Sequence, residues 1–166
     1  MFDYSVPSDA PKQERYQALL SAADAVTMGE PDAIANMANV AALLWHMVPD
    51  LNWAGFYRMV EGQGGEELLL GPFQGKAACI RIAIDKGVCG AAARSGESQC
   101  VPDVHAFPGH IACDAASRSE LVVPVKHDGA VIAVIDLDSP LPGRFDAHDV
   151  AGVEALAALI GNRLVL

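Results

Sequence analysis

The sequence predicts a single α+β domain in which helices pack on a largely antiparallel sheet. The chain has 166 residues, the length of one domain, and 52% of them are hydrophobic, which is enough for a packed core. Apolar residues recur at helical spacing near both ends of the chain. Between them, apolar segments are joined by short glycine-containing turns of the kind that connect antiparallel strands. We expect residues 1–10 to form a loose arm and residues 11–166 to form the domain.

Two helices are expected before the sheet and one after it. The first spans residues 11–28 and stops at Gly29, and the second starts near Pro31. The second helix should bury a stripe of apolar residues, namely Ile34, Met37, Ala38, Ala41, Leu44, Trp45 and Val48. A last helix is expected over 147–164, with Asp146 as its N-cap because an aspartate side chain accepts from the first free backbone N–H groups.

Strands with period-two patterns fill the middle of the chain. They are expected over residues 51–60, 67–73, 79–85, 99–101, 120–126 and 130–138. In the third of these, Ile80, Ile82 and Ile84 share one face. A short alanine-rich helix is expected over 88–95. The long connection over 102–119 contains histidines, aspartates and a cysteine, and a loop of this length inside a small domain is usually functional.

The last two strands should form a hairpin whose register decides which side chains meet. A two-residue turn sets Glu120 opposite Leu137, on the wrong face of the sheet. A three-residue loop over 127–129 sets Glu120 opposite Asp136, so that the acidic side chains face one pocket. We predict the three-residue loop, with Gly129 in the left-handed conformation.

Charge and hydropathy exclude several classes of partner. The net charge of −10 gives an acidic surface, which repels nucleic acid backbones and anionic lipids. No apolar run approaches the length of a membrane span, and the first ten residues lack the pattern of a signal peptide. We therefore expect a cytoplasmic protein that binds neither nucleic acid nor membrane. Its thiols should be reduced in that compartment.

Three cysteines, Cys79, Cys89 and Cys113, are the strongest indication of chemistry. None belongs to a CxxC pair, which excludes a zinc knuckle and a thioredoxin-type motif. Cys113 lies in a segment of glycine, proline, histidine and aspartate, where a core cysteine is unexpected. Cysteines that meet in space suit thiol chemistry, in which one attacks and another resolves. The alternative that they are small buried hydrophobes stays open at this point.

Acidic and aromatic residues suggest a pocket for a small cationic ligand. Asp136 and Asp138 interrupt the apolar run VIAVIDLDS and share a strand face, so burying both without a cation is unfavourable. Trp53 and Tyr57 also share a strand face and could hold an apolar group, or could be ordinary core residues. Glu120 begins an apolar strand, where burial would keep it protonated as a general acid, unless it faces solvent at the strand end.

Five segments together resemble the free methionine-(R)-sulfoxide reductases, which are stand-alone GAF-domain enzymes. The segments are NWAGFYR (52–58), LGPFQGKAAC (70–79), GVCG (87–90), DVHAFPGHIACDAASRSELVVPV (103–125) and VIDLDS (134–139). The resemblance covers about residues 31–160. It implies a GAF fold with helices from both ends of the chain on the sheet. It also implies the thiol-dependent reduction of free L-methionine-(R)-sulfoxide to methionine, a repair reaction in oxidative stress.

The resemblance also implies roles for individual residues. Cys113 corresponds to the nucleophile that forms a sulfenic acid, Cys79 to the resolving thiol that forms the disulfide, and Cys89 to an auxiliary cysteine. The residues that correspond to the substrate pocket are Trp53, Tyr57, Glu120, Asp136 and Asp138. Cys100 lies outside the pattern, and we expect it to be a passive core residue.

The implied partners are free methionine sulfoxide and thioredoxin as the reductant, with no bound cofactor and no metal. A homodimer is left open. One alternative is a GAF sensor that binds a small molecule and catalyses nothing. The other is a metal site made by His105, His110 and Cys113, which is less favoured because the spacing is loose and a fourth ligand is not obvious.

Overall fold

The computed structural model describes residue 7 and the ranges 9–109 and 114–164. Its helices are α1 (Lys12–Thr27), α2 (Ala33–Met47), α3 (Gly87–Ser95) and α4 (Ala147–Gly161), with a short 3₁₀ helix over Val104–Ala106. Its strands are β1 (Trp53–Gly62), β2 (Gly65–Gly75), β3 (Arg81–Ala83), β4 (Gln99–Val101), β5 (Ser119–His127) and β6 (Ala130–Ser139). The expected order of elements is therefore confirmed.

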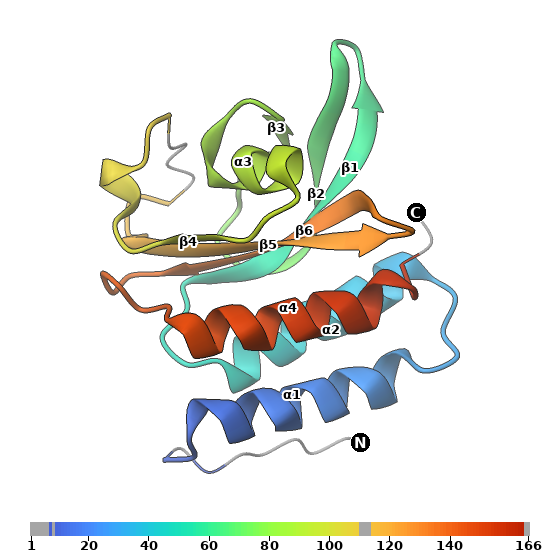
Figure 1. Cartoon of the computed structure of the whole chain (residues 1–166), viewed down its shortest axis with the longest axis vertical. Helices are drawn as coiled ribbons and strands as arrows, with labels where there is room; N and C mark the ends of the chain where they lie inside the picture. Colours follow the sequence, from blue (N-terminus) through green and yellow to red (C-terminus); the bar gives the residue numbers. More distant parts are fainter. Residues whose placement is uncertain (1–6, 8, 110–113, 165–166) are drawn as a thin grey trace.

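One antiparallel sheet organises the domain, with strand order β3-β2-β1-β6-β5-β4. Helices α2 and α4 cover one face of the sheet, and α1 packs outside them, while α3 lies on the opposite face (Figure 1). This arrangement confirms the predicted α+β class with a largely antiparallel sheet. None of the helices in the described part of the chain is long and apolar enough to span a membrane.

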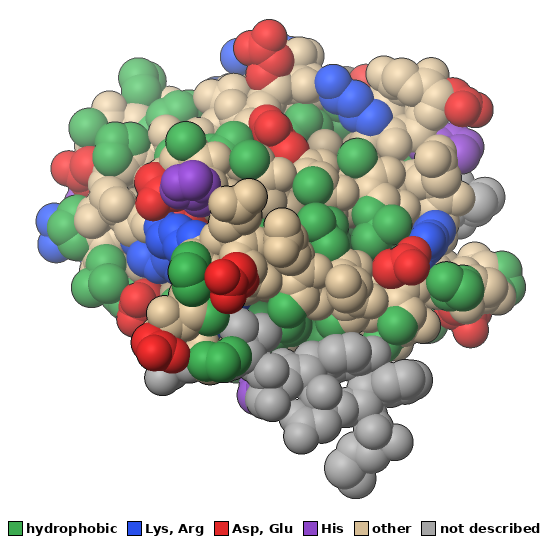
Figure 2. All heavy atoms as spheres, turned by 60° about the horizontal axis from the view of Figure 1, so that its bottom comes forward, with side chains coloured by type: hydrophobic (Ala, Val, Ile, Leu, Met, Phe, Trp, Pro, Cys, Tyr) green, Lys and Arg blue, Asp and Glu red, His purple; other side chains and the backbone are tan. Residues whose placement is uncertain are grey.

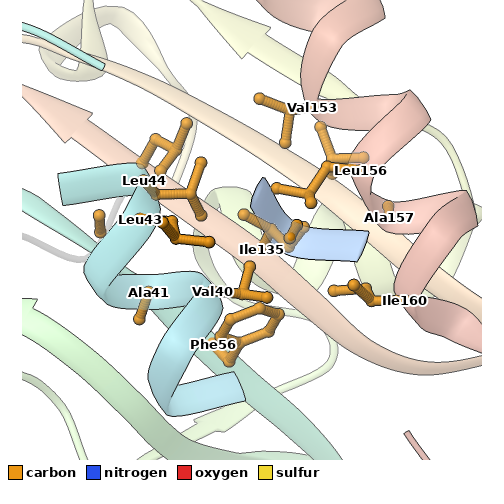
Figure 3. Packing of buried hydrophobic residues seen from close by; sticks show 14 of the residues in the cluster. Val40, Ala41, Leu43, Leu44, Phe56, Ile135, Val153, Leu156, Ala157 and Ile160 are labelled. Carbon is orange, nitrogen blue, oxygen red and sulfur yellow. The ribbon is translucent and has the colours of Figure 1, made fainter. Parts of the chain in front are cut away.

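The main hydrophobic core lies between the sheet and the helices. Successive strand residues point to opposite faces, so Ile135 of β6 and Phe56 of β1 pack toward α2 and α4 (Figure 3). Val40 of α2 and Leu156 of α4 meet them from the helical side. The outer surface of the helical side has acidic, basic and apolar side chains interspersed (Figure 2).

The expected buried stripe of α2 is partly wrong. Ile34 and Trp45 are 46% and 41% exposed and Ala38 is exposed as well, whereas Asn36 is completely buried. The buried face of α2 is rotated away from the three exposed residues and contains Ala33, Asn36, Met37, Val40, Ala41, Leu43, Leu44 and Met47. Asn36 is accommodated because its amide donates to the backbone carbonyls of Glu30 and Arg163.

The third expected strand is also shorter than predicted. β3 covers Arg81–Ala83 alone, and Ile80 is 68% exposed just before it. β3 pairs with β2 at the edge of the sheet, where one of its faces meets solvent. Cys79 therefore lies in the connection that leads into β3 and not on a strand.

The turn of the β5–β6 hairpin is shorter than predicted. His127 pairs with Ala130, so the turn has two residues, Asp128 and Gly129, with φ angles of 49° and 83°. Positive φ at both positions is the type I′ geometry that matches the twist of a hairpin. The left-handed Gly129 is confirmed, and the three-residue loop is wrong.

With a two-residue turn alone, the side chain of Glu120 would face away from those of Asp136 and Asp138. A β-bulge between the turn and the pocket brings them back to the same face of the sheet. The register shifts between Val125 and Lys126. Beyond the shift, Glu120 lies opposite Asp138 and Val122 lies opposite Asp136. A bulge adds one residue to one strand, which has the same effect on facing as one extra loop residue. The acidic side chains therefore share a face as predicted, but through a bulge.

Candidate active site

A pocket opens on the face of the sheet that α3 covers. Its floor is formed by side chains of β1, β5 and β6, and its walls by the first turn of α3, by residues 76–78 and by Asp114 and Ser117. The cavity has a volume of about 560 Å³ including its open mouth. The five residues expected to bind the substrate all line it, namely Trp53, Tyr57, Glu120, Asp136 and Asp138.

Three carboxyl groups meet at the base of the pocket. Glu120 of β5 lies directly opposite Asp138 of β6, and Asp136 is the next residue of β6 on the same face. Glu120 and Asp136 are each only 6% exposed. One oxygen of Asp136, Oδ1, is buried and accepts no hydrogen bond from any residue that the structure describes. A buried carboxylate oxygen without a donor is unfavourable unless a ligand supplies one.

The environment of these three carboxyl groups raises their pKa values and so favours their protonated forms. Burial raises the pKa of Glu120 well above its usual value, and the charges of Asp136 and Asp138 raise it further. Burial and Asp138 likewise raise the pKa of Asp136. Burial raises the pKa of Asp138 to about 7. Perturbed acids in a concave pocket are typical of binding and catalytic sites.

Stacked aromatic rings form the apolar wall. The rings of Trp53 and Tyr57 are 5.8 Å apart between centroids at 22°, and the Trp53 and Phe73 rings are 5.3 Å apart at 12°. Gly55 permits this stack, because a Cβ there would lie 2.4 Å from Cβ of Phe73. Sequence reasoning missed Gly55, although a glycine inside a strand often marks a close approach.

The polar ends of the two pocket aromatics hold the adjacent wall in place. Nε1 of Trp53 donates to the carbonyl of Lys76 at 3.1 Å, and the Tyr57 hydroxyl donates to the carbonyl of Cys79 at 3.0 Å. Burial, followed by the charge of Asp136, raises the pKa of Tyr57, so its hydroxyl remains a donor. The segment that contains Cys79 is thereby fixed against the pocket.

The cysteines differ in their environments. Cys89 is a buried free thiol on the first turn of α3, hydrogen-bonded to Asp136. Burial, together with the charges of Asp136 and Glu120, raises the pKa of Cys89, so it is a weak nucleophile in this state. Cys79 is disulfide-bonded. Cys113 lies outside the described residues, so its role and its expected pairing with Cys79 stay predictions.

Cys100 is not the core residue that we expected. It is a free and exposed thiol on β4, and its Sγ donates to the carbonyl of Phe145 at 3.6 Å. The expectation is wrong because β4 is a three-residue strand at the edge of the sheet, and no other described strand pairs with its outer side.

A metal ion would find a different set of ligands from the expected alternative. His110 and Cys113 lie outside the described residues, so the proposed histidine site is not tested. One donor atom each from Cys89, Glu120 and Asp136 lie within 4.8 Å of one another, a spacing that could hold a divalent cation. The same atoms also suit an ammonium group. Unlike a metal ion, an ammonium group does not require the thiol of Cys89 to be deprotonated.

Lys76, Asp114 and Asn52 form a polar group at the mouth of the pocket that sequence reasoning missed. Nζ of Lys76 is 3.1 Å from Oδ2 of Asp114. Nδ2 of Asn52 donates to Asp114 at 3.3 Å and to Ser117 at 3.0 Å. The sequence contains one indication of this group, because Lys76 and Asp114 are both close in sequence to a cysteine of the predicted site.

Comparison with known proteins agrees with this geometry. A family model described as GAF domain matches residues 15–165. A free methionine-R-sulfoxide reductase of Escherichia coli is 46% identical over 147 residues, which cover 89% of this chain and 87% of the relative. A protein of the same name from Saccharomyces cerevisiae is 42% identical over 163 residues, with 95% and 90% covered.

A solved structure extends the similarity to three dimensions. The free methionine-R-sulfoxide reductase from Neisseria meningitidis in complex with its substrate is 40% identical, with a TM-score of 0.90. The match covers 99% of this chain and 95% of that one. The similarity therefore includes every strand and helix that forms the pocket.

Proposed function

The chain belongs to the GAF-domain family and, within it, to the free methionine-R-sulfoxide reductases, and from this premise we propose that it reduces free methionine-R-sulfoxide to methionine in the pocket described above. The observation that carries the proposal is the buried carboxyl cluster beside an aromatic wall. An amino acid sulfoxide offers an ammonium group to the first and a methyl group to the second.

The carboxyl cluster binds the polar end of the substrate. Asp136 and Asp138 accept hydrogen bonds from the substrate ammonium, which compensates their buried charge. Trp53 and Tyr57 hold the methyl group against their ring faces. Glu120, which burial keeps protonated, acts as the general acid that donates a proton to the sulfoxide oxygen.

The cysteines carry the electrons. The thiolate of Cys113 attacks the substrate sulfur and takes over the oxygen, which gives methionine and a sulfenic acid on Cys113. The thiol of Cys79 then attacks that sulfenic acid, and a disulfide and water are formed. Cys89, on the adjacent first turn of α3, serves as the auxiliary thiol.

An external dithiol must reduce the disulfide after each turnover. Thioredoxin is the reductant that we propose, in the cytoplasm, and the chemistry requires no bound cofactor because the electrons come from thiols. The acidic surface disfavours nucleic acid and anionic membranes as further partners. Whether the working form is a homodimer is a separate question that sedimentation would answer.

The decisive experiment counts thiols in single turnover. Reduced protein incubated with free methionine-R-sulfoxide should lose two thiols for each methionine formed, and peptide mapping should find Cys79 joined to Cys113. The Cys113→Ser variant should form no methionine while keeping its fold, and Cys100→Ser is the matched control that should behave as wild type. Full activity in Cys113→Ser would remove the assigned nucleophile. Binding of the sulfoxide with no loss of thiols would support the GAF sensor instead.

A further inference from the structure

The described part of the pocket wall is strongly unbalanced in charge. It contains four carboxyl groups, those of Asp114, Glu120, Asp136 and Asp138, and a single cationic side chain, that of Lys76. A free amino acid is a zwitterion, so its carboxylate enters this pocket together with its ammonium. The carboxylate would be repelled by the acidic cluster unless a cation faces it.

Lys76 is placed to meet that carboxylate. Its backbone carbonyl accepts the hydrogen bond of the Trp53 indole at 3.1 Å, so the base of the side chain is fixed beside the aromatic wall. The side chain itself is 74% exposed, with its Nζ at the pocket mouth. A long exposed side chain can change its partner with little loss, because solvent screens an exposed ion pair.

Asp114, the present partner of Lys76, does not depend on it. The backbone N–H of Ala116 donates to Oδ1 of Asp114 at 3.0 Å, and Asn52 donates to Oδ2 at 3.3 Å. The hydrogen bond from Ala116 is the main reason why the pKa of Asp114 is below its usual value, and Lys76 is the second. Asp114 therefore stays ionised and hydrogen-bonded when Lys76 moves away.

The start of α3 adds positive potential to the same wall. Gly87 and Val88 line the pocket, and α3 begins at Gly87, where none of the side chains that the structure describes caps the free N–H groups. The first N–H groups of a helix have no acceptor within the helix and favour an anion. Oδ1 of Asp136 in the same pocket accepts no hydrogen bond from the described residues, which indicates that a ligand with donors completes the site.

We propose that Lys76 leaves Asp114 and binds the α-carboxylate of the substrate, with the first turn of α3 beside it, and so selects amino acids whose carboxylate is free. This inference rests on the proposed function. It assigns the two charged ends of the zwitterion to separate walls of the pocket. A methionine sulfoxide inside a peptide is then rejected at two places, since it lacks both the ammonium and the carboxylate.

The test compares two forms of the enzyme on two substrates. Lys76→Met is compared with wild type on free methionine-R-sulfoxide and on its carboxamide, which keeps the ammonium but has no negative charge. We expect Lys76→Met to raise KM for the free acid about tenfold or more, the usual effect of a lost charged hydrogen bond, with kcat almost unchanged. KM for the carboxamide should not change. Lys76→Arg should restore most of the preference for the acid.

The matched control is Lys126→Met, which removes an exposed lysine outside the pocket. Equal increases in KM for both substrates in Lys76→Met, or no increase for either, would overturn the inference. Activity of the wild type on the free acid tests the proposed function separately. If that activity is absent, calorimetric binding of methionine and of methionine amide to the same variants still decides the role of Lys76.

Discussion

A buried aspartate lies on each side of the sheet, one among the helices and one in the pocket, and their surroundings are opposite in kind. On the helical face, Asp149 of α4 is completely buried and surrounded by donors. Tyr16 donates to its Oδ1 at 3.0 Å, Arg144 donates to both oxygens at 3.1 and 3.2 Å, and Lys12 donates to Oδ2. The backbone N–H of Asp146 completes a capping box with the same carboxylate.

On the pocket face, Asp136 is buried to nearly the same degree but has far fewer partners. It is 6% exposed, Cys89 is hydrogen-bonded to it, and its Oδ1 has no donor in the described structure. The neighbouring charges are acidic and raise its pKa. A carboxylate that stabilises the fold is surrounded by cations, whereas a carboxylate that waits for a ligand is not. The difference between Asp149 and Asp136 therefore separates structure from function.

The largest expected effect is on the stability of the helical face. Asp149→Asn removes the buried carboxylate that Lys12 and Arg144 both contact, and removing one partner of a buried ion pair costs about 3–5 kcal/mol. Urea unfolding should show this loss in the free energy of unfolding with an unchanged m-value. The kcat/KM of the folded fraction should equal that of wild type. A variant of wild-type stability would mean that the network around Asp149 contributes nothing net.

For Asp136→Asn we expect the reverse, namely a loss of activity without a loss of stability. Loss of the ion pair with the substrate ammonium should raise KM about a hundredfold, as for a lost hydrogen bond between charged groups, and lower kcat if the sulfoxide is displaced. Stability should stay the same or rise, because the variant removes a poorly compensated buried acid.

A change in the substrate provides the control for Asp136→Asn. Acetylation of the substrate amino group removes the ammonium, so N-acetylmethionine sulfoxide should be a poor substrate for wild type and for the variant alike. Equal rates of the wild type on the free and acetylated sulfoxides would show that the carboxyl cluster does not bind the ammonium.

The same contrast explains how far the sequence could predict the molecule. The order of helices and strands follows from periodicity, and Asp146 as a cap follows from its position before an apolar helix. The β-bulge in the last hairpin and the buried Asn36 do not follow, because they depend on long-range pairing and on backbone carbonyls from distant loops. Local patterns contain no information on those partners.

The candidate site, like the fold, could be predicted only in part from the sequence. Glu120 and Asp136 stand out because they interrupt apolar strands, so the sequence itself shows that they are unusual. Asp149 looks like any other acidic residue near a helix start, although it is more deeply buried than either. Lys76 is equally inconspicuous, since a lysine in a loop is normally on the surface, and only the fold places it beside Asp114.

The smallest expected effect is a pH dependence that belongs to the pocket face alone. Burial raises the pKa of Asp138 to about 7, opposed in part by a hydrogen bond from Ser117. The substrate ammonium binds the ionised carboxylate, and about nine-tenths of Asp138 is ionised at pH 8 but only about one-tenth at pH 6. Affinity for methionine, measured by calorimetry, should therefore fall about tenfold from pH 8 to pH 6.

In the protein without ligand, stability depends on pH in the opposite direction from the affinity for methionine. Between about pH 4 and pH 7, folded Asp138 keeps a proton that the unfolded chain releases, so its contribution to stability decreases as the pH rises through that window. Added methionine should offset the decrease, and its effect on the melting temperature should grow from pH 6 to pH 8. Asp138→Asn should flatten both dependences, and N-acetylmethionine should produce neither in the wild type. Binding of methionine that is as tight at pH 6 as at pH 8 would show that Asp138 does not contact the ammonium, and the buried acids of the pocket would then require another ligand group.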